Sequence, residues 1–447
     1  MAATPTLIEE PLSKVIWRIA LPAMGAMLLR YANHAVDQYW VGRLAQAATA
    51  LAAVSSCNSI IWAIYSPSAL YATGLQALVA RAVGARDPLA HARAMKHGLT
   101  LAVVLGVLVA SLGVLTLDHL LRFQGLSAEV RRLGHGYLAI LFVGLPINYV
   151  GMAFDTVYRA EGDTVTPFRI GLLAALLNAV GAPLLIRGWG PIPSLGINGA
   201  ALMTVGVQCL QLVILAALHR RRERVPGIGF ELAEGWRFIR LGAPVAVSGT
   251  VFSLIYVVLV KILAPFGDES VAALGLGHTI EGLPHFLCIG FATAAATLVG
   301  QNLGARRPEA AARAAWRVAG SLLAILLPVA LTYGLLAPQL LSLFMDPPDP
   351  EVLRWGTQYL RVAAAVQLFA GLELVMWQAL VGAGETLPTT AIDLLVLALR
   401  LPLAWLLAHY LGLGPLGVWL SIGMMTIVGA LAMTLFFRMG TWQRENL

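Results

Sequence analysis

Apolar residues fill most positions of the chain and fall into twelve long segments separated by short polar connections. A membrane-spanning helix needs about 20 mainly apolar residues, and each segment is long enough to supply them. The pattern therefore predicts an all-α integral membrane protein with twelve transmembrane helices. The expected spans are 14–41, 48–80, 95–118, 132–157, 166–187, 196–218, 239–264, 270–300, 314–337, 352–381, 387–410 and 415–438.

Composition and charge agree with a membrane protein and disfavour a soluble one. Of 447 residues, 59% are hydrophobic and only 12% are charged, whereas soluble domains carry about 25% charged residues. The net charge of +7 could suggest a nucleic-acid partner. The basic residues, however, lie between apolar segments, where the preference of Lys and Arg for cytoplasmic loops explains them. We expect no nucleic-acid partner.

The distribution of basic residues in the connections predicts the orientation of the chain. Lys and Arg gather after the second, sixth and eighth segments and in the C-terminal tail, and the alternate loops are poorer in them. The main exceptions are Arg43, Arg187, Arg122, Arg131 and Arg132. By the positive-inside rule, both termini are expected in the cytoplasm of a multi-pass protein of the cell (inner) membrane.

The second half of the chain repeats motifs of the first half at offsets close to 220. The stretches 78–88, 159–164 and 196–199 return as 298–308, 381–386 and 414–417. Six helices per half is an even number, so both halves enter the membrane from the same side. The halves are therefore expected to form two six-helix lobes, related by a pseudo-twofold axis along the membrane normal. We place the N-lobe (helices 1–6) at 1–225 and the C-lobe (helices 7–12) at 226–447.

The first apolar segment carries a polar stripe. Arg30, Asn33, His34 and Asp37 are spaced i, i+3, i+4, i+7, so a helix places them on one face. Ionisable residues in a membrane segment usually face a bundle interior or a wet cavity, and they are functional candidates by default. Alternatively, Arg30 and Asp37 form a structural pair that fixes helix packing.

Several motifs together resemble the multidrug and toxic compound extrusion (MATE) family, in its prokaryotic branch. They are Asp37-x-x-Trp40-Val41-Gly42, the twin Gly-Ala-Arg-x-Pro loops near residues 84 and 304, the stretch 159–167, and Gly384-Glu385-Thr386. The segment 278–305 carries the resemblance further. Family membership implies a V-shaped twelve-helix antiporter that exports amphipathic, often cationic compounds in exchange for protons or sodium by alternating access.

The resemblance implies a cation-coupling site in the N-lobe. Asp37, Asn178 and Thr204 match three residues of that site in relatives, but Ala182 stands where relatives carry a second carboxylate. Sodium needs several hard oxygen ligands, whereas a proton needs one titratable carboxylate in a changing environment. Asp155 either compensates for the missing carboxylate or pairs with Arg159 at i, i+4.

Two further residues are candidates for the same cavity. His34 lies one turn from Asp37 and could share its proton, although a lone histidine in a membrane helix more often serves packing or hydrogen bonding. Gln208 shares a helix face with Thr204 and Gln211, either as polar lining for the substrate or as a helix–helix hydrogen-bonding group.

The C-lobe has its own acidic candidates for substrate binding. Glu281 lies on a stripe with His278 and His285, and we interpret it as a carboxylate that attracts cations or carries a second proton rather than as a metal ligand. Glu373 and Trp377 are at i, i+4, with Gln378 adjacent. An acid beside an aromatic ring suits an organic cation through charge and cation–π contact, although Trp377 could instead be a packing residue.

One more charged pair and the three cysteines receive structural interpretations. Asp393 and Arg400, at i, i+7, are read as a structural charge network. The cysteines, Cys57, Cys209 and Cys288, are odd in number and all fall in apolar segments, which disfavours disulfides and metal binding. We expect no cofactor and no metal.

The sequence therefore predicts a secondary antiporter that exports amphipathic, cationic small molecules in exchange for protons. With Asp37 taking part in substrate binding as well as coupling, cation and proton would compete for one acidic cavity. The alternatives are a sodium-coupled exporter and a flippase for lipid-linked saccharides of the wider superfamily. No motif of a membrane enzyme is present. The expected partners are the substrate and the lipid bilayer, with the protein as a monomer.

Overall fold

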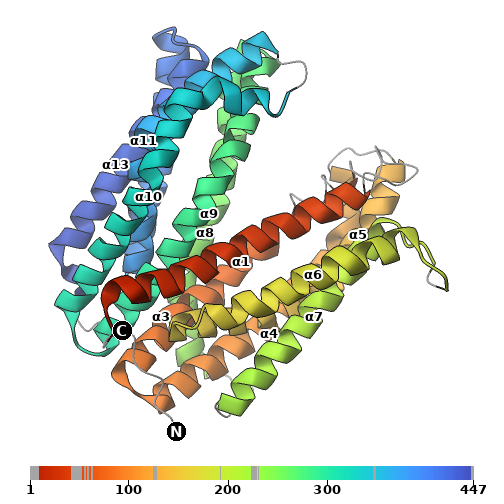
Figure 1. The fold of residues 1–447 in the computed structure, drawn as a ribbon, viewed down its shortest axis with the longest axis vertical. Coiled ribbons are helices and arrows are strands. Elements are labelled where there is room, and N and C mark those ends of the chain that lie inside the picture. Colours follow the sequence, from red (N-terminus) through yellow and green to blue (C-terminus); the bar gives the residue numbers. More distant parts are fainter. Residues whose placement is uncertain are drawn as a thin grey trace. The chain divides into compact units, whose positions relative to one another are not determined.

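The structure is a computed structural model that describes residues 10–41, 53–54, 57, 60–61, 64–123, 128–191, 193–222, 229, 231–345 and 349–443, apart from the side chains at 31, 34, 35, 38, 123, 222 and 232. Long helices dominate these ranges (Figure 1). They are α1 (Leu12–Val41), α3 (Ala69–Ala85), α4 (Pro88–Phe123), α5 (Ala128–Glu161), α6 (Val165–Arg187), α7 (Ile197–Arg222), α8 (Leu232–Leu263), α9 (Asp268–Gly304), α10 (Pro308–Ser342), α11 (Pro350–Ala383), α12 (Thr386–Trp405) and α13 (Pro415–Met439). Short helical turns are η2 (Ser66–Ser68), η3 (Ala264–Phe266), η4 (Leu406–Tyr410) and η5 (Thr441–Gln443).

The predicted all-helical membrane fold is confirmed. Within the described ranges, 11 helices are long and apolar enough to cross a membrane. Each overlaps one predicted span, and the largest differences are at the starts of α4 and α8, which begin seven residues before the predicted spans. The remaining predicted span, 48–80, is described only in part, and α3 covers its end.

The chain divides into two compact units. One unit comprises residues 1–20 and 247–447, and the other comprises residues 21–246. We call the first the C-unit and the second the N-unit. Helices α1 and α8 each contribute residues to both units, because the divisions fall inside them. The lobe boundary between residues 225 and 226 stays a prediction.

The two units have the same internal packing scheme. In the N-unit, α5 lies against α3, α4 and α7, and α6 packs on α7. In the C-unit, α11 lies against α9, α10 and α13, and α12 packs on α13. Figure 1 shows α10, α11 and α13 running alongside one another. Helices α3 to α7 thus have counterparts with equivalent neighbours in α9 to α13, as a parallel repeat requires.

The repeated motifs form matching turns. Gly162 and Gly384 end α5 and α11 with φ of 88° and 90°. The amide after each glycine bonds back to the carbonyl five residues earlier, at 2.9 Å in both units. Arg86 and Arg306 adopt left-handed conformations with φ of 56° and 58° at the ends of α3 and α9. The sequence repeat is therefore also a repeat of backbone conformation.

The third repeated motif brings two backbones close together. Gly196 and Gly414 have φ of 57° and 58° just before α7 and α13. Three residues later, a Cβ on Gly199 or Gly417 would lie 2.5 Å from backbone atoms of the preceding helix segment. Only glycine fits such an approach, which explains why the Gly-x-x-Gly pattern occurs twice.

Candidate functional site

The predicted coupling residues of the N-unit come together around Asp37. Its Oδ1 accepts a hydrogen bond of 3.0 Å from Nδ2 of Asn178 on α6, and the hydroxyl of Thr204 on α7 also bonds to the carboxyl group. Asn178 is 2% exposed. Because Asn178 is fixed in the packed interior, it holds the Asp37 carboxyl group in one position at the C-terminal part of α1.

The amide oxygen of Asn178 is an additional acceptor at this position. It is buried and has no hydrogen-bond partner among the described residues. An unpaired buried acceptor is costly unless a ligand or water satisfies it. With the Asp37 carboxylate and the Thr204 hydroxyl, it brings the side-chain groups that carry oxygen at this position to three.

Ala182 adds no polar atom to this group of side chains. It lies one turn after Asn178 on α6 and is fully buried. A second negative charge next to Asp37 would have to come from a carboxylate on another helix.

Asp155 is held by two arginines. Its Oδ2 lies 3.2 Å from the Arg159 guanidinium, at i, i+4 on α5, and 3.6 Å from that of Arg30 on α1. The Asp155 side chain is 12% exposed, whereas the Arg30 side chain is 56% exposed. The negative charge of Asp155 is therefore already compensated by the two arginines. The ion pair with Arg159, which the i, i+4 spacing allowed, is present.

The remaining N-unit candidates lie in different surroundings. Gln208 hydrogen-bonds to Tyr65, which is also within electrostatic range of Arg30. Tyr137 is buried within electrostatic range of Asp37. The side chain of His34 lies outside the described residues, so its role in sharing a proton stays a prediction.

A second polar cluster lies inside the C-unit. The Tyr359 hydroxyl of α11 donates a hydrogen bond to Oε2 of Glu281 on α9. The His278 ring packs against Tyr256, with ring centroids 4.7 Å apart, and against Tyr359 at 5.9 Å. Arg400 of α12, 6% exposed, lies close enough to Tyr256 to act on its hydroxyl. The cluster therefore draws on four helices.

Two more carboxylates belong to the same electrostatic environment. Glu373 on α11 and Asp393 on α12 are close enough to influence each other, and the Arg400 charge acts on both of them and on Glu281. The Ser248 hydroxyl donates to Asp393. Three half-buried carboxylates thus share one buried guanidinium, so Asp393 and Arg400 belong to the acidic cluster rather than to a separate network.

Trp377 and Gln378 follow Glu373 on the last turns of α11. Both side chains are half-buried. The indole N–H of Trp377 is buried and has no hydrogen-bond partner among the described residues. An unpaired donor one helical turn from Glu373 is a group that a bound molecule could satisfy.

Sequence patterns could not have found the whole C-unit cluster. Glu281, Tyr359 and Arg400 are separated by long stretches of sequence, and a periodicity within one helix reports only the face of that helix. The one available signal was that each is a polar residue within an apolar segment. Among the described residues, no group of three or more His, Cys, Asp or Glu could hold a metal ion.

Known proteins are similar to this chain in both sequence and structure. A family model described as MatE matches residues 22–184 and 244–406, which together make up more than half of the chain. The probable multidrug resistance protein NorM of Thermotoga maritima is 27% identical over 452 residues, covering 97% of this chain and 93% of that protein. The FAD transporter of Shewanella oneidensis is 27% identical over 405 residues, covering 89% and 88%.

A solved structure extends the similarity to the fold. It is the outward-facing conformation of a multidrug resistance MATE family transporter of the MOP superfamily. The match has a TM-score of 0.89 at 25% identity, over 99% of this chain and 98% of that one. The similarity therefore runs through both halves of the chain, and the two family matches fall one in each half.

Proposed function

The chain belongs to the MatE family, whose members are multi-pass membrane transporters rather than enzymes, and we propose that it exports amphipathic cations in exchange for protons. Asp37 carries the proton. Asp37 takes up and releases its proton as the two lobes open alternately to the two sides of the membrane. Both termini face the cytoplasm in this proposal, and the protein acts as a monomer without a cofactor.

The contact between Asp37 and Asn178 is the observation that carries the proposal. A carboxyl group that is shielded from water is driven towards its neutral form. The Asn178 amide and the Thr204 hydroxyl can hydrogen-bond to either form of it. Movement that alternately shields and hydrates Asp37 would therefore take up a proton in one state and release it in the other.

The group of side chains around Asp37 fits a proton better than sodium. Asp37, Asn178 and Thr204 offer a single formal negative charge and few oxygen atoms, whereas hard cations are usually held by about six or more oxygens. Ala182 supplies none. The two arginines beside Asp155 already compensate its charge, which argues against its use as an additional ion ligand.

The acidic C-unit cluster supports a cationic substrate. One guanidinium cannot neutralise Glu281, Glu373 and Asp393 together, and an unpaired buried charge is costly. The cluster must hold protons or attract another cation. Glu373 with Trp377, Gln378 and the aromatic rings near Glu281 would give an organic cation both charge and apolar contact.

One relative favours a second candidate substrate. The similar protein from Shewanella oneidensis is named an FAD transporter, and FAD carries negative phosphates. Arg30 and Arg400 are cations within the two polar clusters that such a substrate could use. A lipid-linked saccharide flippase remains the third candidate, and it would require more basic side chains than the acidic C-unit cluster provides.

The experiment is efflux by reconstituted protein carrying Asp37→Asn, which keeps the shape of the side chain but cannot ionise. We expect loss of cationic dye efflux with a normal elution profile and unfolding temperature. The matched control is Asp118→Asn, a carboxylate whose side chain is 68% exposed and lies 3.5 Å from His135; it should transport like the unmodified protein. Normal dye efflux by Asp37→Asn would refute the coupling role, and transport of FAD alone would refute the cationic substrate.

A further inference from the structure

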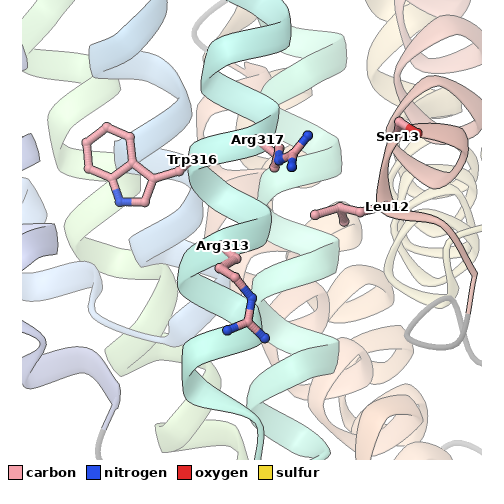
Figure 2. A pocket seen from close by; sticks show the side chains of 5 residues that line it. All are labelled: Leu12, Ser13, Arg313, Trp316 and Arg317. Carbon is pink, nitrogen blue, oxygen red and sulfur yellow. The ribbon is translucent and has the colours of Figure 1, made fainter.

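A basic pocket in the C-unit lies apart from both polar clusters. It has a volume of about 580 Å³ and is lined by Leu12, Ser13, Arg313, Trp316 and Arg317. This volume lies within the range of about 300–1,000 Å³ that is usual for ligand pockets. In Figure 2, the two arginines extend from successive turns of α10, and Leu12 extends from the start of α1 towards that helix.

The charges in the pocket are not balanced by protein acids. Arg313 and Arg317 are exposed, and within the described ranges neither forms an ion pair with a carboxylate. Glu309, one turn before Arg313 on α10, is the nearest acid along that helix. Near the start of α1, both carboxylate oxygens of Glu10 are bonded to Arg18 at 2.8 and 2.9 Å. The pocket therefore presents two unpaired guanidinium groups.

The position of the pocket along α10 matches the headgroup region of a bilayer. The 35 residues of α10 span about 52 Å at about 1.5 Å per residue, which exceeds the hydrocarbon core of about 30 Å. Arg313 is the sixth residue of the helix and Arg317 the tenth. A helix centred in the membrane would place them in or just below the headgroup layer, at the end predicted to be cytoplasmic.

Aromatic residues mark the same depth. Trp316 lies between the two arginines in sequence, packs edge-on against Phe437, and has the Arg438 guanidinium 5.3 Å from its ring centroid. Tryptophan is enriched at membrane interfaces because its ring is amphipathic. Leu12 supplies apolar surface beside the arginines, suited to the upper part of an acyl chain, and Ser13 supplies a hydroxyl donor.

We propose that this pocket binds the phosphate group of an anionic phospholipid from the leaflet that it faces. The paired guanidinium groups bind the phosphate oxygens, since Arg matches phosphate geometry with two parallel hydrogen bonds. Leu12 contacts the lipid chain. The lipid ties the start of α1 to α10, so binding stabilises the C-unit. This inference does not rest on the proposed transport function.

The test measures lipid retention by the full-length protein. The protein is extracted from vesicles of phosphatidylcholine with phosphatidylglycerol, and bound lipid is counted by native mass spectrometry. We expect retained phosphatidylglycerol, with affinity falling about fivefold for each arginine removed, which corresponds to about 1 kcal/mol per basic residue near the surface. The variants are Arg313→Gln, Arg317→Gln and the double variant. The charge-matched control is the double variant Arg306→Gln/Arg307→Gln, which changes the preceding loop and leaves the pocket lining unaltered.

Two comparisons make the result decisive. Phosphatidylglycerol should raise the unfolding temperature of the unmodified protein and of the control, but not that of the double pocket variant. Glycerol 3-phosphate in solution should not reproduce the effect. Equal retention by the pocket variants and the control would overturn the site, as would absence of phosphatidylglycerol from the unmodified protein. Equal stabilisation by glycerol 3-phosphate would overturn the assignment to lipid. The single variants keep the test valid if the double variant does not fold.

Discussion

At the scale of single residues, the two carboxylates of the N-unit differ in what surrounds them. Asp37 receives neutral donors, Asn178 and Thr204, whereas Asp155 is paired with Arg30 and Arg159. The negative charge of Asp155 is thus already compensated by two guanidinium groups. The groups that contact Asp37 are neutral, so its charge can change without breaking an ion pair. This difference makes Asp37 the better proton carrier.

Removing the Asn178 amide should move the pH dependence of transport. A hydrogen bond to an ionised group is stronger than one to a neutral group, so loss of the amide costs ionised Asp37 more than protonated Asp37. The amide donor stabilises ionised Asp37, so in Asn178→Ala the protonated form persists to higher pH. We expect the midpoint of the pH profile of dye efflux to move upward.

The matched control for this change is Gln208→Ala. Gln208 lies one turn from Thr204 on the same helix, but it acts on Tyr65 and is not among the groups that act on Asp37. The midpoint of the pH profile of dye efflux by Gln208→Ala should equal that of the unmodified protein. A downward shift in Asn178→Ala, or an equal upward shift in both variants, would contradict the role assigned to the amide.

At the scale of helices, glycine residues allow the backbones of neighbouring helices to approach each other closely. A Cβ at Gly382 of α11 would lie 2.4 Å from the backbone oxygen of Ala296 on α9. Because the clash is with backbone, the helices would have to separate. We expect Gly382→Ala to destabilise the protein by about 1–3 kcal/mol, the usual cost of overpacking a core, measured by thermal unfolding in detergent.

Gly320 of α10 supplies the control for this substitution. It lies inside a helix with nothing within 4 Å of the added Cβ. Alanine there should be neutral or should stabilise the protein by up to about 1 kcal/mol, because glycine is a poor helix former. Equal destabilisation by both substitutions would mean that helix propensity, rather than the contact between α9 and α11, decides the outcome.

Most of the helices could be predicted from the sequence, whereas most contacts between them could not. The apolar segments predicted every membrane-spanning helix among the described residues, because each segment is a continuous apolar run that is long enough to cross a bilayer. The approach of Asn178 to Asp37, 141 residues apart, was available only through the family resemblance. The inclusion of Arg400 and Tyr359 with Glu281 had no sequence signal beyond their polarity within apolar segments, since no periodicity within one helix reports how helices pack together.

At the scale of the whole molecule, the duplication explains why one packing scheme serves both units. Equivalent turns at Gly162 and Gly384, and at Gly196 and Gly414, have nearly the same φ. The polar residues, however, are not duplicated. The N-unit presents Asp37 with neutral partners, while the C-unit has three carboxylates around Arg400. The repeat thus preserves the scaffold, and the two units differ in chemistry.

The predicted orientation can be tested at the two ends of α10. Glu309 and Glu351 are exposed and follow the starting prolines of α10 and α11, so they lie at opposite ends of the span between them. In a background without the native cysteines, Glu351→Cys should react with an impermeant maleimide in intact cells. Glu309→Cys should react only after permeabilisation. Labelling of both from outside would refute the two-lobe topology, and the reverse pattern would refute cytoplasmic termini.

The measurement that tests the central claim most directly is transport into proteoliposomes under a single imposed gradient. We predict that a pH gradient alone drives movement of a cationic dye, that a sodium gradient at equal pH does not, and that Asp37→Asn abolishes the proton-driven movement. Dye movement driven by sodium at equal pH, and absent under a proton gradient, would contradict the account and make Asp155 an ion ligand.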